Sequence, residues 1–222
     1  IRPNAGDAHW ARANHLYNGY LNYEGALAEL EVARESLPNA SYVFSLMGYI
    51  QRRQGRWEES VRSLERASEL DPRNINTLYQ TGLSYGGFRR YGEQKSKFNR
   101  ILTIEPNNLA AQADRAFVEV NWKADTAPLH QLIDEIRTTD PAAITKIADR
   151  WLLCALAERD VASAKDAVLA SGENPLAQTG TNFTRPFVEG VIARMINDEH
   201  EAQLAFTAAR AQQEKIVRTQ PD

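Results

Sequence analysis

The sequence predicts an all-α fold, a solenoid of antiparallel helix pairs. Three consecutive stretches, Asp7–Ala40, Ser41–Asn74 and Ile75–Asn108, repeat without gaps at a spacing of 34 residues. Within them, apolar and small residues recur three and four positions apart, which is the period of a helix. A proline stands at the same position of each stretch, where it would end a helix. A fixed period of this length is typical of stacked helical repeats and not of a closed globule.

Columns of residues that share a position in the three stretches carry the repeat. We expect each stretch to hold a first helix, a turn, a second helix and a second turn, with the proline after the second helix. The columns are Trp10, Phe44 and Leu78; Tyr17, Gln51 and Tyr85; Tyr23, Trp57 and Tyr91; Leu30, Leu64 and Phe98; and Pro38, Pro72 and Pro106.

The second stretch shows how each element is encoded. Gly48 shares its column with Gly82, so the second helix of each pair can approach the first closely at this point. Gly55 can adopt the positive φ that ends the first helix. We expect Trp57 to cover the turn that follows.

This pattern resembles the tetratricopeptide repeat (TPR) family, whose unit has the same length. The resemblance implies a right-handed superhelical solenoid, with about six pairs in a chain of 222 residues. The chain is similar to the TPR regions of large bacterial multidomain signalling proteins, which join such repeats to a cyclase, a kinase or a winged-helix regulator. The residues that carry the match read Trp10-x2-Ala13-Asn14-x2-Tyr17, Phe44-x2-Met47-Gly48-x2-Gln51 and Leu78-x2-Thr81-Gly82-x2-Tyr85.

After these three regular units, residues 7–108, the columns decay. We expect residues 109–175 to hold two degenerate helix pairs. Thr126 is a candidate cap for one of these helices. The next pair is expected over Ala142–Ala157 and Val161–Ser171.

Residues 176–222 are expected to hold a linker and a final helix pair. Gly190 and Phe206 keep the spacing of the repeat, and the last helix is expected to be about two turns longer than the others. The longest loop-like segment is Ser171–Asn182. Because the first residue is Ile1 and the chain ends as a repeat would, we expect a fragment of a longer protein.

Composition limits the classes of partner. The net charge is −3, so there is no overall attraction to nucleic acid or to an anionic membrane. No run approaches the roughly 18 to 20 apolar residues that span a bilayer, and we expect a cytoplasmic protein without membrane contact. The third unit is basic, which leaves nucleic-acid binding as the weakest alternative. Its bases are Arg89, Arg90, Lys95, Lys97 and Arg100.

No pattern of catalytic or metal-ligating residues stands out, and we expect neither an enzyme nor a cofactor. Cys154 is the only cysteine and lies in an apolar run, so we interpret it as a buried structural thiol. The four histidines are scattered, and their spacing to Cys154 predicts no metal site. Gly86-Gly87 inside a first helix indicates either a loosened or early helix end, or close approach of a ligand.

The resemblance places a binding groove on the first helices of the pairs. Tyrosine and arginine are common anchors in binding sites, because they offer large contact area with fixed polar groups. The alternative interpretation is packing between repeats for the tyrosines and a solvated surface for the arginines. The residues that fall in the groove columns include Tyr42, Tyr49, Arg52, Arg53, Tyr79, His15, Asn18 and Asn76.

We therefore expect a protein-protein interaction module or scaffold that holds a protein or peptide partner in its concave groove, as the regulatory arm of a bacterial signalling protein. The alternative is a self-association array that forms a homo-oligomer without a peptide ligand. The sequence does not name the partner.

Overall fold

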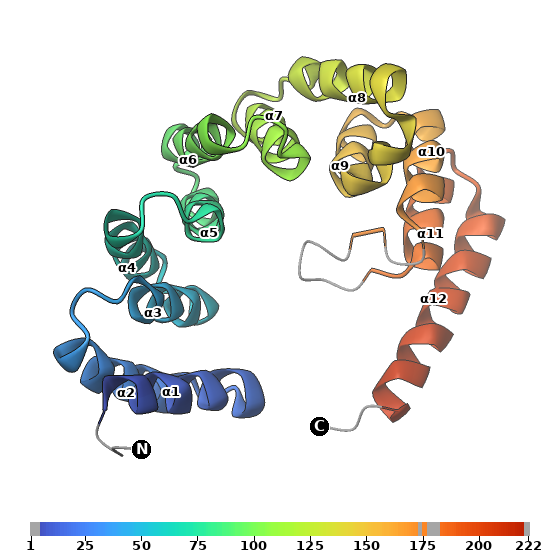
Figure 1. Cartoon of the computed structure of the whole chain (residues 1–222). Coiled ribbons are helices and arrows are strands. Elements are labelled where there is room, and N and C mark those ends of the chain that lie inside the picture. The colour runs from blue at the N-terminus through green and yellow to red at the C-terminus, as the bar shows by residue number, and fades with distance from the viewer. Residues whose placement is uncertain (1–4, 173–174, 177–182, 220–222) are drawn as a thin grey trace. The chain divides into compact units, whose positions relative to one another are not determined.

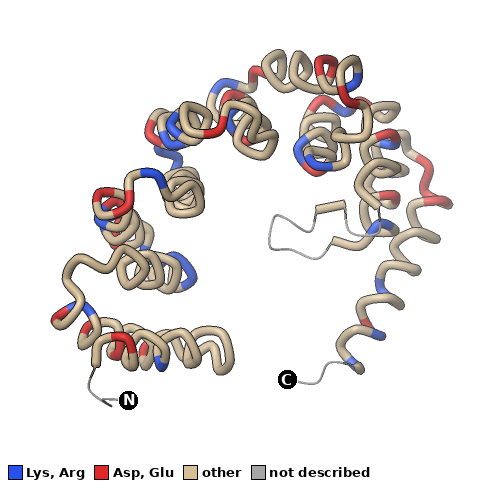
Figure 2. Tube along the Cα trace, in the orientation of Figure 1, with Lys and Arg blue, Asp and Glu red and all other residues tan. Residues whose placement is uncertain are grey.

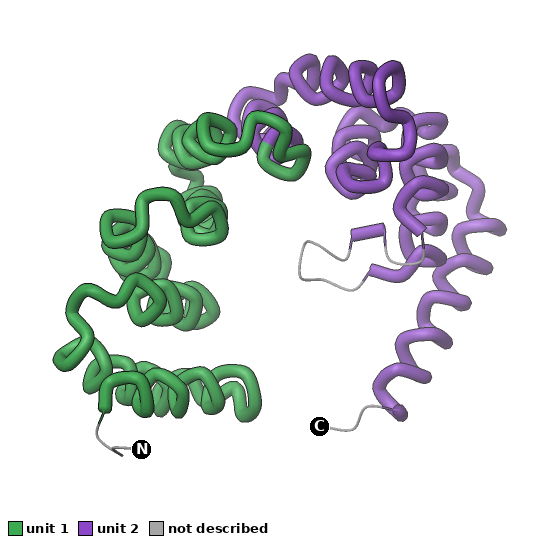
Figure 3. The backbone as a smooth tube through the Cα atoms, in the orientation of Figure 1, with its two compact units in different colours: residues 1–111 green, residues 112–222 purple. Residues whose placement is uncertain are grey.

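The computed structural model describes residues 5–172, 175–176 and 183–219, and within these residues every regular element is helical (Figure 1). This confirms the predicted all-α solenoid of antiparallel helix pairs. The chain divides into two compact units, residues 1–111 and 112–222 (Figure 3). Among the described helices, none combines the length and the apolar character that a bilayer-spanning helix requires.

Unit 1 contains three helix pairs, and the seventh helix starts at its end. The helices are α1 (Gly6–Tyr20), α2 (Tyr23–Ser36), α3 (Ser41–Arg53), α4 (Trp57–Leu70), α5 (Ile75–Gly87), α6 (Tyr91–Ile104) and α7 (Leu109–Lys123). Unit 2 holds the rest of α7 and the later helices. These are α8 (Ala127–Thr139), the 3-10 helix η1 (Pro141–Lys146), α9 (Ala148–Glu158), α10 (Val161–Ser171), α11 (Arg185–Met195) and α12 (Glu199–Thr219).

The predicted close approach within a pair occurs at Gly48. A methyl group on Gly48 would lie 2.5 Å from Leu64 Cγ and 3.1 Å from the backbone oxygen of Ser60. The Ser60 hydroxyl donates to the Gly48 carbonyl oxygen at 2.7 Å. The absence of a side chain at this position therefore lets α4 rest on the backbone of α3, as the sequence predicts.

A single residue with left-handed backbone geometry lies between the two helices of every described pair. Only one of the six is a glycine, so the turn geometry recurs where the sequence gives no sign of it. The residues and their φ angles are Leu21 (50°), Gly55 (75°), Arg89 (63°), Ala124 (54°), Arg159 (59°) and Asn197 (59°).

Backbone hydrogen bonds lock these turns. In four of the six turns the residue after the left-handed position donates its N–H to a carbonyl five residues earlier, which is the bond of a Schellman motif. In the turns at Leu21 and Ala124 the acceptor lies six residues earlier. Arg56 donates to Gln51 at 2.9 Å, and Arg90 donates to Tyr85 at 3.0 Å. The same position can also cap the next helix, as Asp160 does by accepting from the Ser163 N–H at 3.1 Å. The first helix thus ends and the second begins within two or three residues.

The two adjacent glycines of α5 have a role that neither sequence interpretation gave them. Helix α5 continues through Gly86 and Gly87 instead of ending early. A methyl group on Gly87 would overlap the indole ring of Trp57. The indole of Trp57, at the start of α4, therefore packs on the end of the next first helix, and this glycine makes room for the ring.

The prediction of one helix over Ala142–Ala157 is wrong for the first part of this range. The chain forms η1 up to Lys146, breaks at Ile147, and only then begins α9. Ile147 has φ −126° and ψ 8°, outside the helical region, and its side chain is fully buried. Burial of the Ile147 side chain favours the break over a continuous helix.

The last helix, α12, has 21 residues, against 14 in each of α2, α4 and α6, as the sequence predicts. Unit 2 also repeats the glycine contact of unit 1, because a methyl group on Gly190 would lie 2.6 Å from Phe206 Cε1. Most of the predicted loop Ser171–Asn182 lies outside the described residues.

The left-handed turns predict opposite effects of two substitutions. Arg89→Gly relieves backbone strain and is expected to stabilise the protein by about 1 kcal/mol. Gly55→Ala is expected to destabilise it by about 1 kcal/mol, although no atom lies within 4 Å of the new methyl group. Urea unfolding measured by circular dichroism checks both values, and a destabilising Arg89→Gly would contradict the explanation.

Candidate functional site

The first helices of unit 1 share a polar and aromatic groove. Helices α3 and α5 lie on one side of unit 1, and α4 and α6 lie on the other (Figure 1). The groove has a volume of about 380 Å³ and takes side chains from α1, α3 and α5 and from the turn before α5. It is lined by Trp10, Asn14, Tyr17, Asn18, Ser41, Tyr42, Ser45, Leu46, Tyr49, Asn74, Asn76 and Thr77. A second hollow of about 460 Å³ extends it along α1, past His15 and Gly19.

Five of the eight predicted groove residues are brought together here. His15 and Asn18 come from α1, Tyr42 and Tyr49 from α3, and Asn76 from α5. Residues at these positions of consecutive first helices meet because the helix pairs stack at the 34-residue period.

Hydrogen bonds between neighbouring pairs fix the two groove tyrosines. The amide of Asn76 donates to the Tyr49 hydroxyl at 3.0 Å. The Tyr42 hydroxyl donates to the Asp7 carboxylate at 2.7 Å, which, together with partial burial, raises the pKa of Tyr42. Burial raises the pKa of Tyr49. Both phenols therefore stay neutral at physiological pH.

The remaining three predicted residues have other surroundings. Arg52 donates to the Gln80 backbone oxygen at 3.1 Å and also to the side chain of Gln80, so it links α3 to α5. Tyr79 packs its ring against Phe98 of α6, with centroids 5.6 Å apart. Arg53 is exposed, and a hydrogen bond to Tyr17 raises the pKa of its guanidinium.

The sequence reasoning missed three important groove residues. The sequence places Trp10 and Tyr17 in repeat columns and not in groove columns, yet both line the groove. The rings of Trp10 and Tyr42 meet edge to face, with centroids 5.2 Å apart. Asn14 stands in the glycine column, and its backbone oxygen accepts from the Asn18 amide at 3.1 Å. Two asparagines four residues apart share one face of a helix, and this spacing is the sequence signal that could have placed Asn14 in the groove beside Asn18.

The basic third unit does not form a bare cationic surface. Arg90 pairs with Glu93, Lys97 pairs with Glu65 at 2.6 Å, and Arg100 donates to the Pro72 backbone oxygen at 2.9 Å. Figure 2 shows acidic residues interspersed with the basic ones in this part of unit 1. This arrangement gives little support to nucleic-acid binding, which needs a continuous basic patch.

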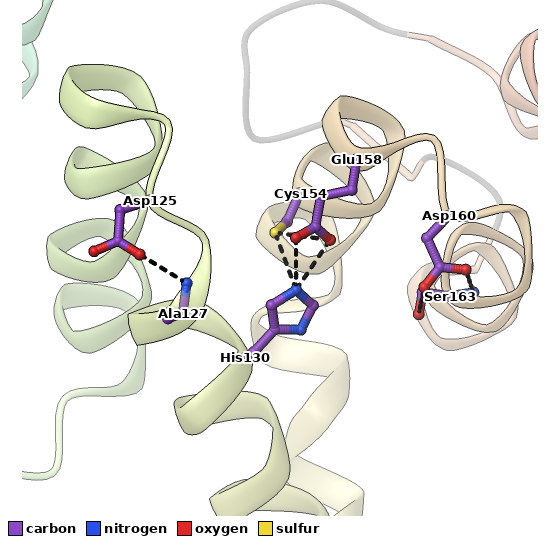
Figure 4. A network of polar contacts seen from close by, with 7 residues as sticks. All are labelled: Asp125, Ala127, His130, Cys154, Glu158, Asp160 and Ser163. Atoms are coloured by element: carbon purple, nitrogen blue, oxygen red, sulfur yellow. Dashed lines mark hydrogen bonds and ion pairs between the residues drawn. The ribbon is translucent and has the colours of Figure 1, made fainter.

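Unit 2 contains a cluster of polar side chains that the sequence spacing did not predict. His130 of α8 points at Cys154 and Glu158, which lie one turn apart on α9 (Figure 4). His130 Nε2 lies 2.9 Å from each carboxylate oxygen of Glu158 and 4.0 Å from Cys154 Sγ. The Cys154 thiol donates to Glu158 at 3.8 Å. Sequence spacing does not predict this cluster, because His130 is 24 residues from Cys154 and lies in a pair whose repeat columns have decayed.

Burial confirms Cys154 as an enclosed thiol and controls its ionisation. Its side chain is fully buried, and burial together with the charge of Glu158 raises the pKa of the thiol to about 12. Burial opposes ionisation of Glu158 as well, but hydrogen bonds from Thr126 and His130 outweigh it, and the pKa of Glu158 is lowered. Thr126 thus bonds Glu158, whereas its predicted capping bond to α8 does not form.

The raised pKa of Cys154 predicts slow alkylation. At pH 8, iodoacetamide is expected to modify the folded chain about a thousandfold more slowly than the urea-unfolded chain, because only thiolate reacts. Since the folded-state pKa is raised, the thiol stabilises the fold below about pH 8.5, and this contribution is lost as the pH rises toward about 12. Mass spectrometry of the single cysteine measures the rate, and equal rates for folded and unfolded chain would refute the environment described.

Known proteins share parts of this sequence and its fold. Residues 48–87 match the TPR repeat family. Sperm-associated antigen 1 of Mus musculus is 26% identical over 117 residues, which make up 53% of this chain. The chain spans only 12% of the length of that relative.

Solved structures match most of the chain at low identity. PilW, described as a type IV pilus biogenesis factor, has a TM-score of 0.70 at 13% identity, covering 93% of this chain and 92% of its own. PilF of Pseudomonas aeruginosa has a TM-score of 0.64 at 16% identity, covering 97% and 92%. YrrB, a TPR protein, has a TM-score of 0.56 at 14% identity, covering 93% and 94%. At these identities the likeness concerns the fold alone. Residues 48–87 therefore carry a recognisable TPR repeat, and the solved structures show that the chain shares their fold.

Proposed function

We propose that this chain is a protein-interaction module whose groove in unit 1 binds an extended segment of a protein partner. The observation that carries the proposal is the groove itself, which three consecutive first helices line with amide and aromatic side chains. YrrB, similar in fold, is described as having an unusual peptide-binding site, which supports the same use of a TPR surface.

The groove chemistry suits a peptide backbone. An asparagine amide offers both a donor and an acceptor, as a peptide group does. Asn14 and Asn18 on α1 and Asn76 on α5 place such amides along the groove, where the Asn18 nitrogen already donates to Asn14 and the Asn76 nitrogen to Tyr49. An extended segment exposes its N–H and C=O groups at regular intervals, so a row of amides can hold it without requiring one sequence.

Aromatic side chains and one charge supply selectivity. Trp10, Tyr42 and Tyr49 offer flat apolar area between the amides. Arg53 bonds to Tyr17, a groove residue, and so places a positive charge at the edge of the groove. We expect the preferred segment to combine an apolar residue with an acidic one that meets Arg53.

The resemblance of the repeats to the TPR regions of bacterial signalling proteins motivates a wider role. We propose that the chain has no catalytic activity of its own and acts as the regulatory arm of a bacterial signalling protein. A cytoplasmic location remains part of this prediction.

A peptide selection tests the groove. Peptides displayed on phage are selected on the full 222-residue chain, and the affinity of a selected peptide is measured by fluorescence anisotropy. Asn18→Ala and Tyr42→Ala change exposed side chains of the groove, and each is expected to weaken binding about tenfold or more. Asn107→Ala, an exposed asparagine outside the groove, is the matched control and should bind as the unchanged chain does. Equal affinity for all variants would place binding elsewhere.

Self-association is the second candidate function. Helix α12 exposes Leu204, Ile216 and Val217, the last with 70% of its surface accessible. Exposed apolar side chains on one long helix favour contact with another chain. Sedimentation over a range of concentrations separates the two functions, because a strict monomer that still binds the peptide supports only the groove.

A further inference from the structure

We propose that His130, Cys154 and Glu158 form a zinc site that ties α8 to α9. This inference is independent of the groove and of its ligand. The three side chains offer an imidazole nitrogen, a sulfur and a carboxylate, and their ligand atoms all lie within 4.8 Å of one another. They converge from two helices of unit 2 (Figure 4).

The separations of the ligand atoms fit a tetrahedral ion. Zinc bonds of about 2.0 to 2.3 Å at tetrahedral angles place neighbouring ligand atoms about 3.4 to 3.6 Å apart. The observed separations are 4.0 Å from Sγ to Nε2, 3.8 Å from Sγ to the carboxylate and 2.9 Å from Nε2 to the carboxylate. Each separation therefore differs from the required value by about half an ångström or less. Small side-chain rotations are enough to remove such a difference.

The helices already hold the three residues in place. Cys154 and Glu158 are four residues apart on α9 and so project from one face of it. Arg137 of α8 lies over the ring of Trp151 of α9, with its guanidinium carbon 4.4 Å from the ring centroid. Thr126, next to α8, bonds Glu158 and orients it, as the residues around a metal site commonly orient its ligands.

The type of donor selects the metal. A thiolate and an imidazole favour zinc and similar transition metals, whereas calcium and magnesium require several oxygen ligands. Zinc would replace the thiol proton, which leaves to solvent, and would bond His130 through Nε2 and the ionised Glu158 through a carboxylate oxygen. The fourth position is left to water.

Access and burial also suit such a site. The side chain of His130 is 42% exposed and that of Glu158 is 29% exposed, so an ion can reach them from solvent. Cys154 is fully buried and forms the inner end of the proposed metal site. A bound ion would join two helices in a part of the chain where the repeat columns have decayed.

Cobalt(II) binding to the full, reduced chain tests the site, because cobalt replaces zinc and absorbs light. We expect one cobalt per chain, a thiolate-to-cobalt charge-transfer band, and loss of that band when zinc is added. Zinc at about a hundredfold excess over its Kd should raise Tm by about 5–10 °C.

Variants identify the ligands. His130→Asn and Glu158→Gln change accessible side chains and should keep native helicity by circular dichroism. Each is expected to weaken zinc binding at least tenfold and to abolish the rise in Tm. Cys154→Ser should remove the charge-transfer band. His200→Asn, an exposed histidine on α12, is the matched control and should leave all three readouts unchanged.

Two results would overturn the proposal. One is a cobalt complex without a thiolate band. The other is zinc affinity in folded His130→Asn and Glu158→Gln equal to that of the unchanged chain, which would locate the metal at other side chains.

Discussion

The approach of the second helix to one position of the first determines how the pairs of this protein are built. In three of the described pairs the first helix has a glycine at that position, and the side chain that fills the space comes sixteen residues later. Leu64 and Phe98 are fully buried in this way, and each such side chain contributes about 1.5–3 kcal/mol through burial. The contacts are those of Gly48 with Leu64, Gly82 with Phe98 and Gly190 with Phe206.

The groove is a consequence of this packing. The second helices pack against one side of the first helices. The opposite side of α1, α3 and α5 is therefore not covered by them, and it forms the groove. Buried hydroxyl contacts then join successive pairs, as between Ser45 and Thr77 at 3.2 Å and between Ser60 and Ser84 at 3.0 Å. Ser45 and Thr77 also line the groove, and the groove side chains differ from pair to pair, whereas the glycine contacts recur at the 34-residue period. The scaffold is therefore general, and the specificity we propose lies in residues that do not repeat.

The sequence predicts what depends on periodicity and misses what depends on individual contacts. Helix pairs, the glycine contacts and the long α12 follow from spacing alone. The left-handed geometry of Arg89 does not follow from spacing. The arginine side chain gives no local signal of it, and the surrounding helix pair imposes the turn. Column position placed Arg52 in the groove, yet its long side chain reaches Gln80 instead. The meeting of His130 with Cys154 depends on how two degenerate pairs pack, which no spacing rule for metal ligands describes.

A double-mutant cycle at Gly48 and Leu64 tests the central contact most directly. In the unchanged chain, Gly48→Ala is expected to cost about 1–3 kcal/mol of the free energy of unfolding, because the new methyl group would overlap Leu64. In the Leu64→Ala background the overlap with Leu64 is gone and only the 3.1 Å approach to the Ser60 backbone oxygen remains, so the same change should cost clearly less, since alanine also favours a helix. Urea unfolding of the four proteins gives the coupling free energy. A cost of Gly48→Ala that is equal in both backgrounds would contradict the account.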